Sequence, residues 1–433
     1  MNSHAAEELA GFQTGFAVRP AQLVTARSAD DIVSAVRHAA AERLSIAVQA
    51  TGHGLPGPVE GGLLVSTRLM DRVAVDPVAR TARLQAGVRW GQVVEAAAPH
   101  GLAPLNGSAP SVGAVSYTLG GGLGILAREF GYAADHVRSL DVVTGDGELR
   151  HVTRESAPEL YWGLLGGGHS LGVVTELEIG LVGVGKVYGG SLSFDGREVD
   201  AAEVLRAYEA WTRTVPDGLT SSFAAVPYPD LPGLPPQLRG RYVVSVRLAW
   251  TGADGERLVA PLREIGPVLS DSLREMPYAE SHTIHSDPDF PHSYYGDSAF
   301  VSELDLDVAG EVLRATGPGA GAMVVVQVNH LGGALAASAS ASANSVPWRE
   351  GRFLVRLLAM GEREKGRAVL DPVFGLLAPV TLGRAVNFAF GGGDRTAGLY
   401  EPGTRQRLAG LKSRYDPASL FPDYVGEFSA PRG

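Results

Sequence analysis

The chain has 433 residues, of which 45% are hydrophobic, a formal net charge of −10 and no cysteine. Its length favours about two or three folding units, and the lack of cysteine excludes disulfides, thiolate catalysis and cysteine-ligated metals. The negative charge, without a cluster of Lys and Arg, argues against nucleic acid or an anionic membrane as a partner. No long apolar run and no secretory signal is visible, so we expect a cytoplasmic protein that spans no membrane.

The first 100 residues predict a mixture of helices and short strands. Ser28 and Asp31 have the spacing of a helix capping box, and the strand "SIAVQA" (45–50) follows that helix. The next short strands include a pair joined by a hairpin at "DPVAR" (76–80), and a helix then runs from near Trp90 to Gly101. This order indicates an α+β fold and not a regular doubly wound sheet.

Glycine-rich stretches occur at "TGHG" (51–54), at 107–137 and at 164–181. Backbone amides that lack a neighbouring Cβ can approach a pyrophosphate closely, as a phosphate-rich cofactor requires. Gly122, Gly124 and Ala127 even match the G-x-G-x-x-A fingerprint of nucleotide-binding folds. The acidic residue at the expected distance lies inside a β-like run, however, so this fingerprint is unconvincing, and a nicotinamide-dependent Rossmann dehydrogenase is only a rival hypothesis.

Together, the motifs resemble those of a known family. The sequences are "TGHG" (51–54), "PSVGAVSYTLGGGLG" (110–124), "EFGYAADHV" (129–137), "GGGHSLGVVTELEIGL" (166–181) and "RLAGLKSRYDPASLF" (407–421). In this order they resemble the FAD-linked oxidases of the vanillyl-alcohol oxidase fold, especially the branch of berberine bridge enzyme and 6-hydroxynicotine oxidase.

The resemblance implies a division of the chain into three parts. Residues 1–185 would form a PCMH-type FAD-binding domain of two subdomains. Residues 186–384 would form an α+β substrate domain, an antiparallel sheet with helices on one face. Residues 385–433 would be a C-terminal segment that returns to the FAD domain.

The resemblance also gives His53 a role. It implies a covalent bond from this histidine to the 8α-methyl of the flavin, and a neutral imidazole is chemically a suitable nucleophile. Two alternatives stay open: His53 is an ordinary turn residue, or it lies beside a noncovalently held flavin. Relatives with a second tether have a cysteine where this chain has Ala109, so a single tether is the most that the chain can form.

Other FAD contacts follow from the resemblance position by position. Tyr117 would donate a hydrogen bond near flavin N1–C2=O and help to stabilise the reduced flavin, although a packed aromatic residue is an equally good interpretation. Tyr117 and Asn387 are the predicted catalytic residues. The predicted cofactor-binding residues are Thr51, Gly52, His53, Gly54, Val112, Gly113, Ser116, Tyr117, Thr118, Gly121, Gly172, Val174 and Asn387.

The middle of the chain predicts a sheet with helices. Strands are expected at 241–250 and 322–333 and helices at 201–215 and 255–266. The segments "QVNHLGGALA" and "VPWREGRFLVRLLA" resemble the sheet that covers the flavin in the family, with Arg349 at a position that is commonly basic. The low-complexity "LAASASASANS" (335–345) is expected to be a loop and strand edge.

Histidines gather in "SHTIHSDPDFPHSYYGD" (281–297). Prolines break any helix there, so we predict no metal site and instead a loop over the pocket. Tyr294 and Tyr295 are then candidates to face the substrate, although surface exposure is the alternative.

The segment "AVNFAFGGGD" (385–394) has Phe388 where relatives place an acid–base tyrosine, and phenylalanine cannot accept a proton. Either the substrate needs only hydride loss from carbon, or the protein catalyses a cyclisation without net oxidation. The favoured function is an FAD-dependent oxidase of a small molecule, with a natural-product intermediate slightly preferred. A hydride would pass to flavin N5, and O2 would reoxidise the flavin and yield H2O2.

Overall fold

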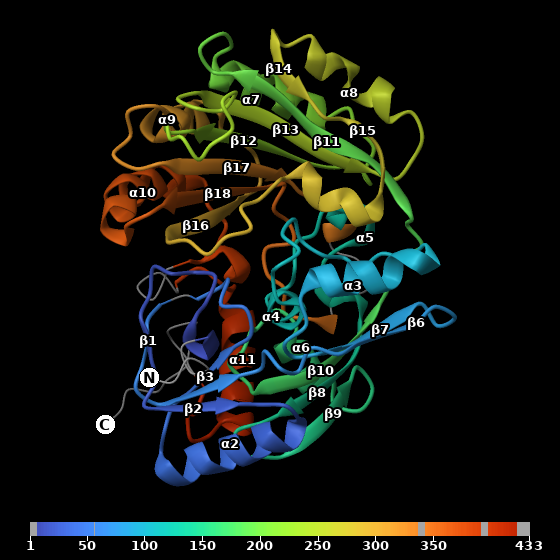
Figure 1. Cartoon of the computed structure of the whole chain (residues 1–433), viewed down its shortest axis with the longest axis vertical. Coiled ribbons are helices and arrows are strands. Elements are labelled where there is room, and N and C mark those ends of the chain that lie inside the picture. Colours follow the sequence, from blue (N-terminus) through green and yellow to red (C-terminus); the bar gives the residue numbers. More distant parts are fainter. Residues whose placement is uncertain (1–6, 56, 337–342, 391–396, 422–433) are drawn as a thin grey trace.

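A computed structural model describes residues 7–55, 57–336, 343–390 and 397–421. In Figure 1 the N-terminal elements fill the lower half and an eight-stranded sheet the upper half. Among the described residues, every helix is too short or too polar to cross a bilayer.

The lowest layer is a small parallel sheet covered by a helix. Strand β2 (Gln22–Thr25) and strand β3 (Ile46–Gln49) both pair with the central strand β5 (Leu63–Ser66). Helix α2 (Ala29–Glu42) begins at the predicted capping box, in which the Ser28 side chain and the Asp31 carboxylate satisfy each other's backbone amides. The pair β1 (Val18–Arg19) and β4 (Val59–Glu60) lies beside this sheet.

A five-stranded antiparallel sheet forms the second subdomain. Its order is β6 (Val73–Asp76), β7 (Thr81–Gln85), β10 (Val173–Gly180), β8 (Val137–Val143) and β9 (Leu149–Thr153). The predicted hairpin joins β6 to β7, and the predicted helix is α3 (Trp90–Ala97). Further helices are α4 (Ala114–Leu119), α5 (Ala127–Phe130) and α6 (Pro158–Leu164). Gly122 and Gly124 follow helix α4 and not a strand, so the nucleotide-binding fingerprint lacks its βαβ unit and the Rossmann hypothesis is wrong.

The third sheet is antiparallel and has eight strands within the described residues. Its order is β14 (Val268–Asp271), β11 (Lys186–Asp195), β13 (Tyr242–Trp250), β12 (Thr220–Pro227), β17 (Val324–His330), β18 (Phe353–Met360) and β16 (Tyr294–Val301), and β15 (Arg274–Pro277) also pairs with β11.

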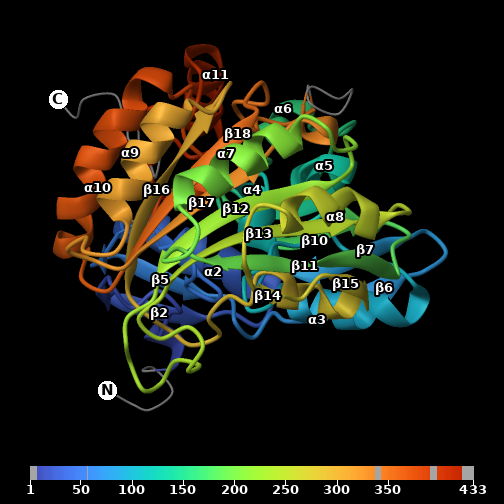
Figure 2. The same ribbon diagram turned by 90° about the horizontal axis from the view of Figure 1, so that it is seen from above.

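Helices cover one face of this sheet only. Figures 1 and 2 show them together on the side away from the N-terminal half: α7 (Ala201–Thr212), α8 (Gly255–Arg263), α9 (Leu306–Thr316) and α10 (Arg363–Leu377). Val246, Phe223, Val328 and Val355 point from the strands into the core under these helices. Because side chains alternate along a strand, their neighbours in sequence face the N-terminal half. The predicted α+β class with helices on one face is therefore confirmed.

The C-terminal helix α11 (Pro402–Tyr415) returns to the N-terminal half, where it contacts α6. The Ile46 amide of strand β3 donates to the Leu420 carbonyl at 2.7 Å. We retain the division at 185/186 and 384/385 as a proposal, which is supported by the start of the large sheet at Lys186. The remaining turns of 3-10 helix are Ala98–His100, Ala133–His136, Tyr278–Ile284, Gly333–Leu335, Ala378–Val380 and Val386–Phe388. Residues 337–342 and 391–396, which carry parts of two predicted segments, lie outside the described residues.

Candidate active site

A cavity of about 650 Å³ lies between the N-terminal half and the large sheet. Its walls come from strand β3 and the loop after it, from helix α4 and from the loop 167–170. Tyr294 of β16, Arg356 of β18 and the segment 386–390 close it on the other side. The volume is within the range of about 300–1,000 Å³ that is typical of small-molecule and cofactor sites.

The loop after β3 brings backbone to the cavity surface. Gly52 has a φ of 69°, and a Cβ there would lie 2.6 Å from Gly11 Cα, so only glycine fits. A Cβ on Gly54 would meet no atom within 4 Å, although Gly54 lines the cavity. The loop thus leaves room for a ligand next to its main chain.

His53 lines the cavity between these glycines and is held from several sides. Its ring stacks on Phe12 with a centroid separation of 3.8 Å and an interplanar angle of 10°. Nδ1 lies 2.9 Å from Thr51 Oγ1, and Nε2 lies 3.0 Å from Ser111 Oγ. The Tyr294 hydroxyl donates to the His53 carbonyl. These contacts fix the orientation of the imidazole.

Burial, reinforced by the charge of Arg89, lowers the pKa of His53 to about 4. The imidazole is therefore neutral at neutral pH and retains a nucleophilic lone pair.

Tyr117 is in helix α4, and its ring packs edge-on against Trp90 with a centroid separation of 5.4 Å. It also lines the cavity. Its hydroxyl is buried and has no hydrogen-bond partner among the described residues. Burial raises the pKa of Tyr117 well above 10, so the group is a protonated donor. Because an unpaired buried hydroxyl is costly, this donor is suited to a bound group.

The Asn387 side chain joins the C-terminal segment to α4. Its Nδ2 donates to the Tyr117 carbonyl at 2.8 Å. A Cβ on Gly120 would lie 1.9 Å from Asn387 Oδ1, so this contact requires glycine. The neighbouring Phe388 ring lies under the Arg356 guanidinium, 3.6 Å from centroid to Cζ.

Most of the predicted cofactor-binding residues line the cavity, and four do not. Those in the lining are Thr51, Gly52, His53, Gly54, Val112, Ser116, Tyr117, Val174 and Asn387. Those outside it are Gly113, Thr118, Gly121 and Gly172.

Three of the four residues outside the lining have packing contacts that explain their identity. The Thr118 hydroxyl donates to the Ala114 carbonyl inside α4. A Cβ on Gly172 would lie 2.6 Å from the Val143 carbonyl oxygen, and one on Gly121 would lie 3.1 Å from a methyl of Val346.

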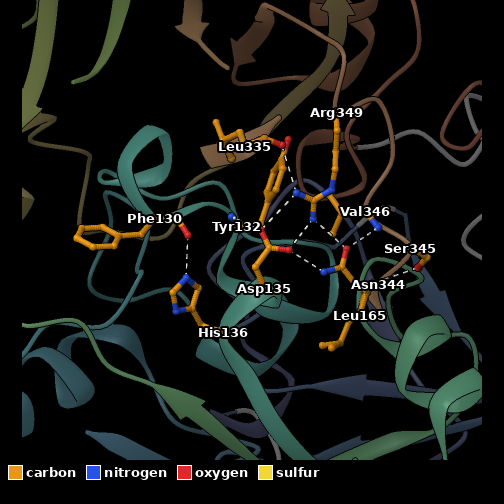
Figure 3. A network of polar contacts seen from close by, with 10 residues as sticks. All are labelled: Phe130, Tyr132, Asp135, His136, Leu165, Leu335, Asn344, Ser345, Val346 and Arg349. Atoms are coloured by element: carbon orange, nitrogen blue, oxygen red, sulfur yellow. Dashed lines mark hydrogen bonds and ion pairs between the residues drawn. The ribbon is translucent and has the colours of Figure 1, made fainter. Parts of the chain in front are cut away.

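Arg349 does not line the cavity, contrary to its expected place in the roof. Figure 3 shows it in a polar network with Asp135 and Asn344. It is buried against Asp135, with Nη2 2.6 Å from Oδ1, and it also donates to Asn344 Oδ1. The loop before β18, and not the strand, carries this residue. The basic residue that the sheet presents to the cavity is Arg356.

The two tyrosines of β16 point to opposite faces of the sheet, as strand alternation requires. Tyr294 lines the cavity. Tyr295 is fully buried in the core under the helices, and its hydroxyl lies 3.3 Å from Asp371 Oδ1.

The histidine-rich loop contributes Asp287 to the main cavity, where it accepts a hydrogen bond from Ser108. Among the described residues, no group of three His, Asp or Glu side chains is arranged to hold a metal.

Sequence reasoning did not single out His169 and Arg356 as site residues, although both line the cavity. Burial lowers the pKa of His169 to about 4, so this imidazole is neutral at neutral pH. The signal for Arg356 was a single charge inside the apolar strand "FLVRLLAM". Arg356 faces the cavity because the helices cover the opposite face of this strand, and the local sequence does not show which face is covered.

The lining residues fit a flavin dinucleotide. The cavity has glycine loops that leave the main chain accessible, an unpartnered phenol donor and a neutral imidazole. Exposed main-chain amides suit a pyrophosphate, and the other two groups suit the ring system.

Comparisons with known proteins agree with this assignment. Residues 20–153 match the family model described as an FAD binding domain. The chain is 31% identical over 268 residues to (R)-6-hydroxynicotine oxidase of Paenarthrobacter nicotinovorans, an alignment that covers 60% of the chain and 56% of that protein.

Two solved structures show the same fold over nearly the whole chain. The crystal structure of 6-hydroxy-D-nicotine oxidase from Arthrobacter nicotinovorans has a TM-score of 0.83 at 23% identity and covers 99% of this chain and 96% of its own. Glucooligosaccharide oxidase from Acremonium strictum, described with a 6-S-cysteinyl, 8α-N1-histidyl FAD, has a TM-score of 0.82 at 20% identity and covers 96% and 94%.

Proposed function

We propose that the protein is an oxidase whose flavin occupies the 650 Å³ cavity and is bonded to His53. The proposal starts from the family of the chain, which belongs to the FAD-linked oxidoreductases of the vanillyl-alcohol oxidase fold. The observation that carries the proposal is the neutral, oriented imidazole of His53 in a glycine loop at the cavity wall.

The proposed roles of the lining residues follow from their contacts. The main chain of Gly52 and Gly54, with Val112 and Ser116, would hold the pyrophosphate and ribityl chain. Tyr117 would donate its free hydroxyl to the pyrimidine side of the ring, and Asn387 would keep α4 and the C-terminal segment together. When bound, FAD accepts a hydride from a substrate carbon and passes the electrons to O2, which gives H2O2.

A single tether is all that this chain allows. It has no cysteine, and Ala109 stands in the loop that would carry a second link. Ser111 and Thr51 flank the two ring nitrogens of His53, so one nitrogen can be oriented by a hydroxyl while the other bonds.

The cavity lacks a tuned general base among its described residues. Phe388 cannot accept a proton, and the two carboxylates in the lining are Glu60 and Asp287. Although the surrounding protein partly desolvates the carboxylate, the Ser108 hydroxyl and the charges of Arg247 and Arg356 hold the pKa of Asp287 below its usual range. A carboxylate whose pKa lies so far below neutral pH is a poor proton acceptor. This supports a substrate that needs only hydride loss, such as an amine already deprotonated in solution.

A flavin enzyme without net oxidation, for example a cyclase, is the second candidate, and Phe388 is the observation that favours it. We keep a natural-product intermediate as the proposed substrate and the cytoplasm as the proposed location.

The test is a reductive titration of the purified protein. Candidate amines and alcohols are added without oxygen while the flavin absorbance is followed, and air is then admitted while H2O2 is measured. An oxidase shows bleaching followed by stoichiometric H2O2. Turnover of a substrate with no bleaching at any stage would favour the cyclase instead.

A further inference from the structure

A polar patch lies on the cavity-facing side of the large sheet. Its residues are Ser222 of β12, Arg247 of β13, Gln327 and Asn329 of β17 and Arg356 of β18. Cross-strand register places Arg247 opposite Ser222, Ser222 opposite Asn329, and Gln327 opposite Arg356. Since residues two apart share a face, all five point to the same side.

This patch lines a second, small cavity of about 40 Å³. Ser108, Leu123 and Arg356 line both cavities, so the small one adjoins the proposed flavin site. Its size suits one small polar group, because a water occupies about 30 Å³.

The two guanidiniums in the patch are not neutralised by ion pairs. Among the described residues, the Arg247 guanidinium has no hydrogen-bond or ion-pair partner, although its backbone is paired within the sheet. Arg356 Nη1 donates to Gln327 Oε1 at 3.2 Å, and its other contact is the Phe388 ring. Burial lowers the pKa of Arg356 to about 10 and also lowers that of Arg247, but both stay charged at neutral pH.

The nearby titratable groups leave one positive charge in excess. Asp287 is ionised, and burial lowers the pKa of His285 to about 3, which keeps that imidazole neutral. His285 lines the small cavity together with the two arginines, whereas Asp287 lines the larger one. Two cations and one anion thus lie around these two adjoining cavities.

The patch also holds buried polar atoms that lack partners among the described residues. They are Gln327 Nε2, Asn329 Oδ1 and Ser222 Oγ, and Gln327 is only 8% exposed. Buried groups of this kind nearly always have a hydrogen-bond partner. A donor and a hydroxyl beside two guanidiniums match the oxygens of a carboxylate.

We propose that Arg247 and Arg356 form an anion subsite and that the substrate carries a carboxylate-type group which enters it while the oxidised carbon faces the flavin. The identification of the bound anion as part of the substrate rests on the proposed function, whereas binding of an anion to the patch does not require flavin.

The test uses benzoate and its neutral counterpart benzamide as probes. Each is titrated into the full-length protein by calorimetry in a buffer without other small carboxylates. Because a hydrogen bond to a charged group is stronger than one between neutral groups, benzoate should bind about 10-fold or more tightly than benzamide. Equal affinities, or no binding of either probe, would overturn the proposal.

Two substitutions with opposite expected effects on benzoate affinity add to the test. Arg247→Gln should lower benzoate affinity about 10-fold and leave benzamide unchanged, whereas Asp287→Asn should raise benzoate affinity several-fold because it removes the competing negative charge. The matched controls are Arg257→Gln and Asp289→Asn, at exposed positions outside both cavities. Unchanged selectivity in Arg247→Gln would refute the subsite. A colourless protein would refute the flavin proposal and leave this calorimetric result interpretable.

Discussion

The Asn387 side-chain amide donates to the Tyr117 carbonyl at 2.8 Å, so the C-terminal segment is bonded to the helix that presents Tyr117 to the cavity. The contact is possible only because residue 120 has no side chain: a Cβ there would lie 1.9 Å from Asn387 Oδ1.

Gly120→Ala should therefore destabilise the protein through Asn387 alone. The backbone at residue 120 has a φ of −89°, which alanine adopts freely. We expect a loss of about 1–3 kcal/mol in the free energy of unfolding from the clash. In an Asn387→Ala background the same change should cost much less, and urea denaturation of the four proteins measures this coupling. Equal costs in the two backgrounds would contradict the proposed contact.

Tyr117→Phe should have effects of opposite sign on two properties. It removes a buried hydroxyl that has no partner among the described residues, so the stability of the flavin-free protein should stay constant or rise. In the flavin-loaded protein it removes a donor to the reduced ring, so the midpoint potential should fall. A lower potential without loss of stability supports a role toward flavin. An unchanged potential would mean that Tyr117 is only a packed aromatic residue.

Arg349→Met should be strongly destabilising. The change leaves the Asp135 carboxylate, whose side chain is 4% exposed, without its cation, and breaking a buried pair costs about 3–5 kcal/mol. Lys365→Met breaks an exposed pair with Glu362 and should cost at most about 1 kcal/mol. Urea denaturation of the two variants measures these losses in the free energy of unfolding. Equal small losses would show that the network in Figure 3 is not a stabilising feature.

Stability should fall as the pH is lowered from about 6.5. Burial lowers the pKa of His330 to about 3, so this histidine stays neutral in the folded protein while the unfolded chain takes up a proton below about 6.5. His53, His169 and His285 act in the same direction. His330→Gln should reduce the slope of unfolding free energy against pH by up to about 1.4 kcal/mol per unit. His38→Gln, at an exposed position, is the control, and equal slopes would refute the assignment.

Local sequence patterns predicted elements well because local forces determine them. The capping box at Ser28, the hairpin between β6 and β7 and the helix that begins at Trp90 all appear as expected. The motifs also led to the loop of His53 and to Asn387, both of which line the cavity.

The parts that could not be predicted depend on tertiary contacts. "AVSYTL" resembles a strand by composition but forms helix α4. Arg349 and Arg356 are only seven residues apart. Arg349 lies before the start of β18 and contacts Asp135, whereas Arg356 lies within β18 and lines the cavity, because the helices cover the other face of the strand. The polar patch of the proposed anion subsite joins four strands, so no single stretch of sequence reveals it.

The most direct test of the central claim is to precipitate the purified protein with acid and record the visible spectrum of pellet and supernatant. The native chain and His169→Ala should keep the yellow colour in the pellet, because the proposed bond to the flavin is at His53, whereas His169 only lines the cavity. His53→Ala should release all of it to the supernatant. Release from the native chain would contradict the tether, and absence of flavin from the native protein even after addition of FAD would contradict the account as a whole.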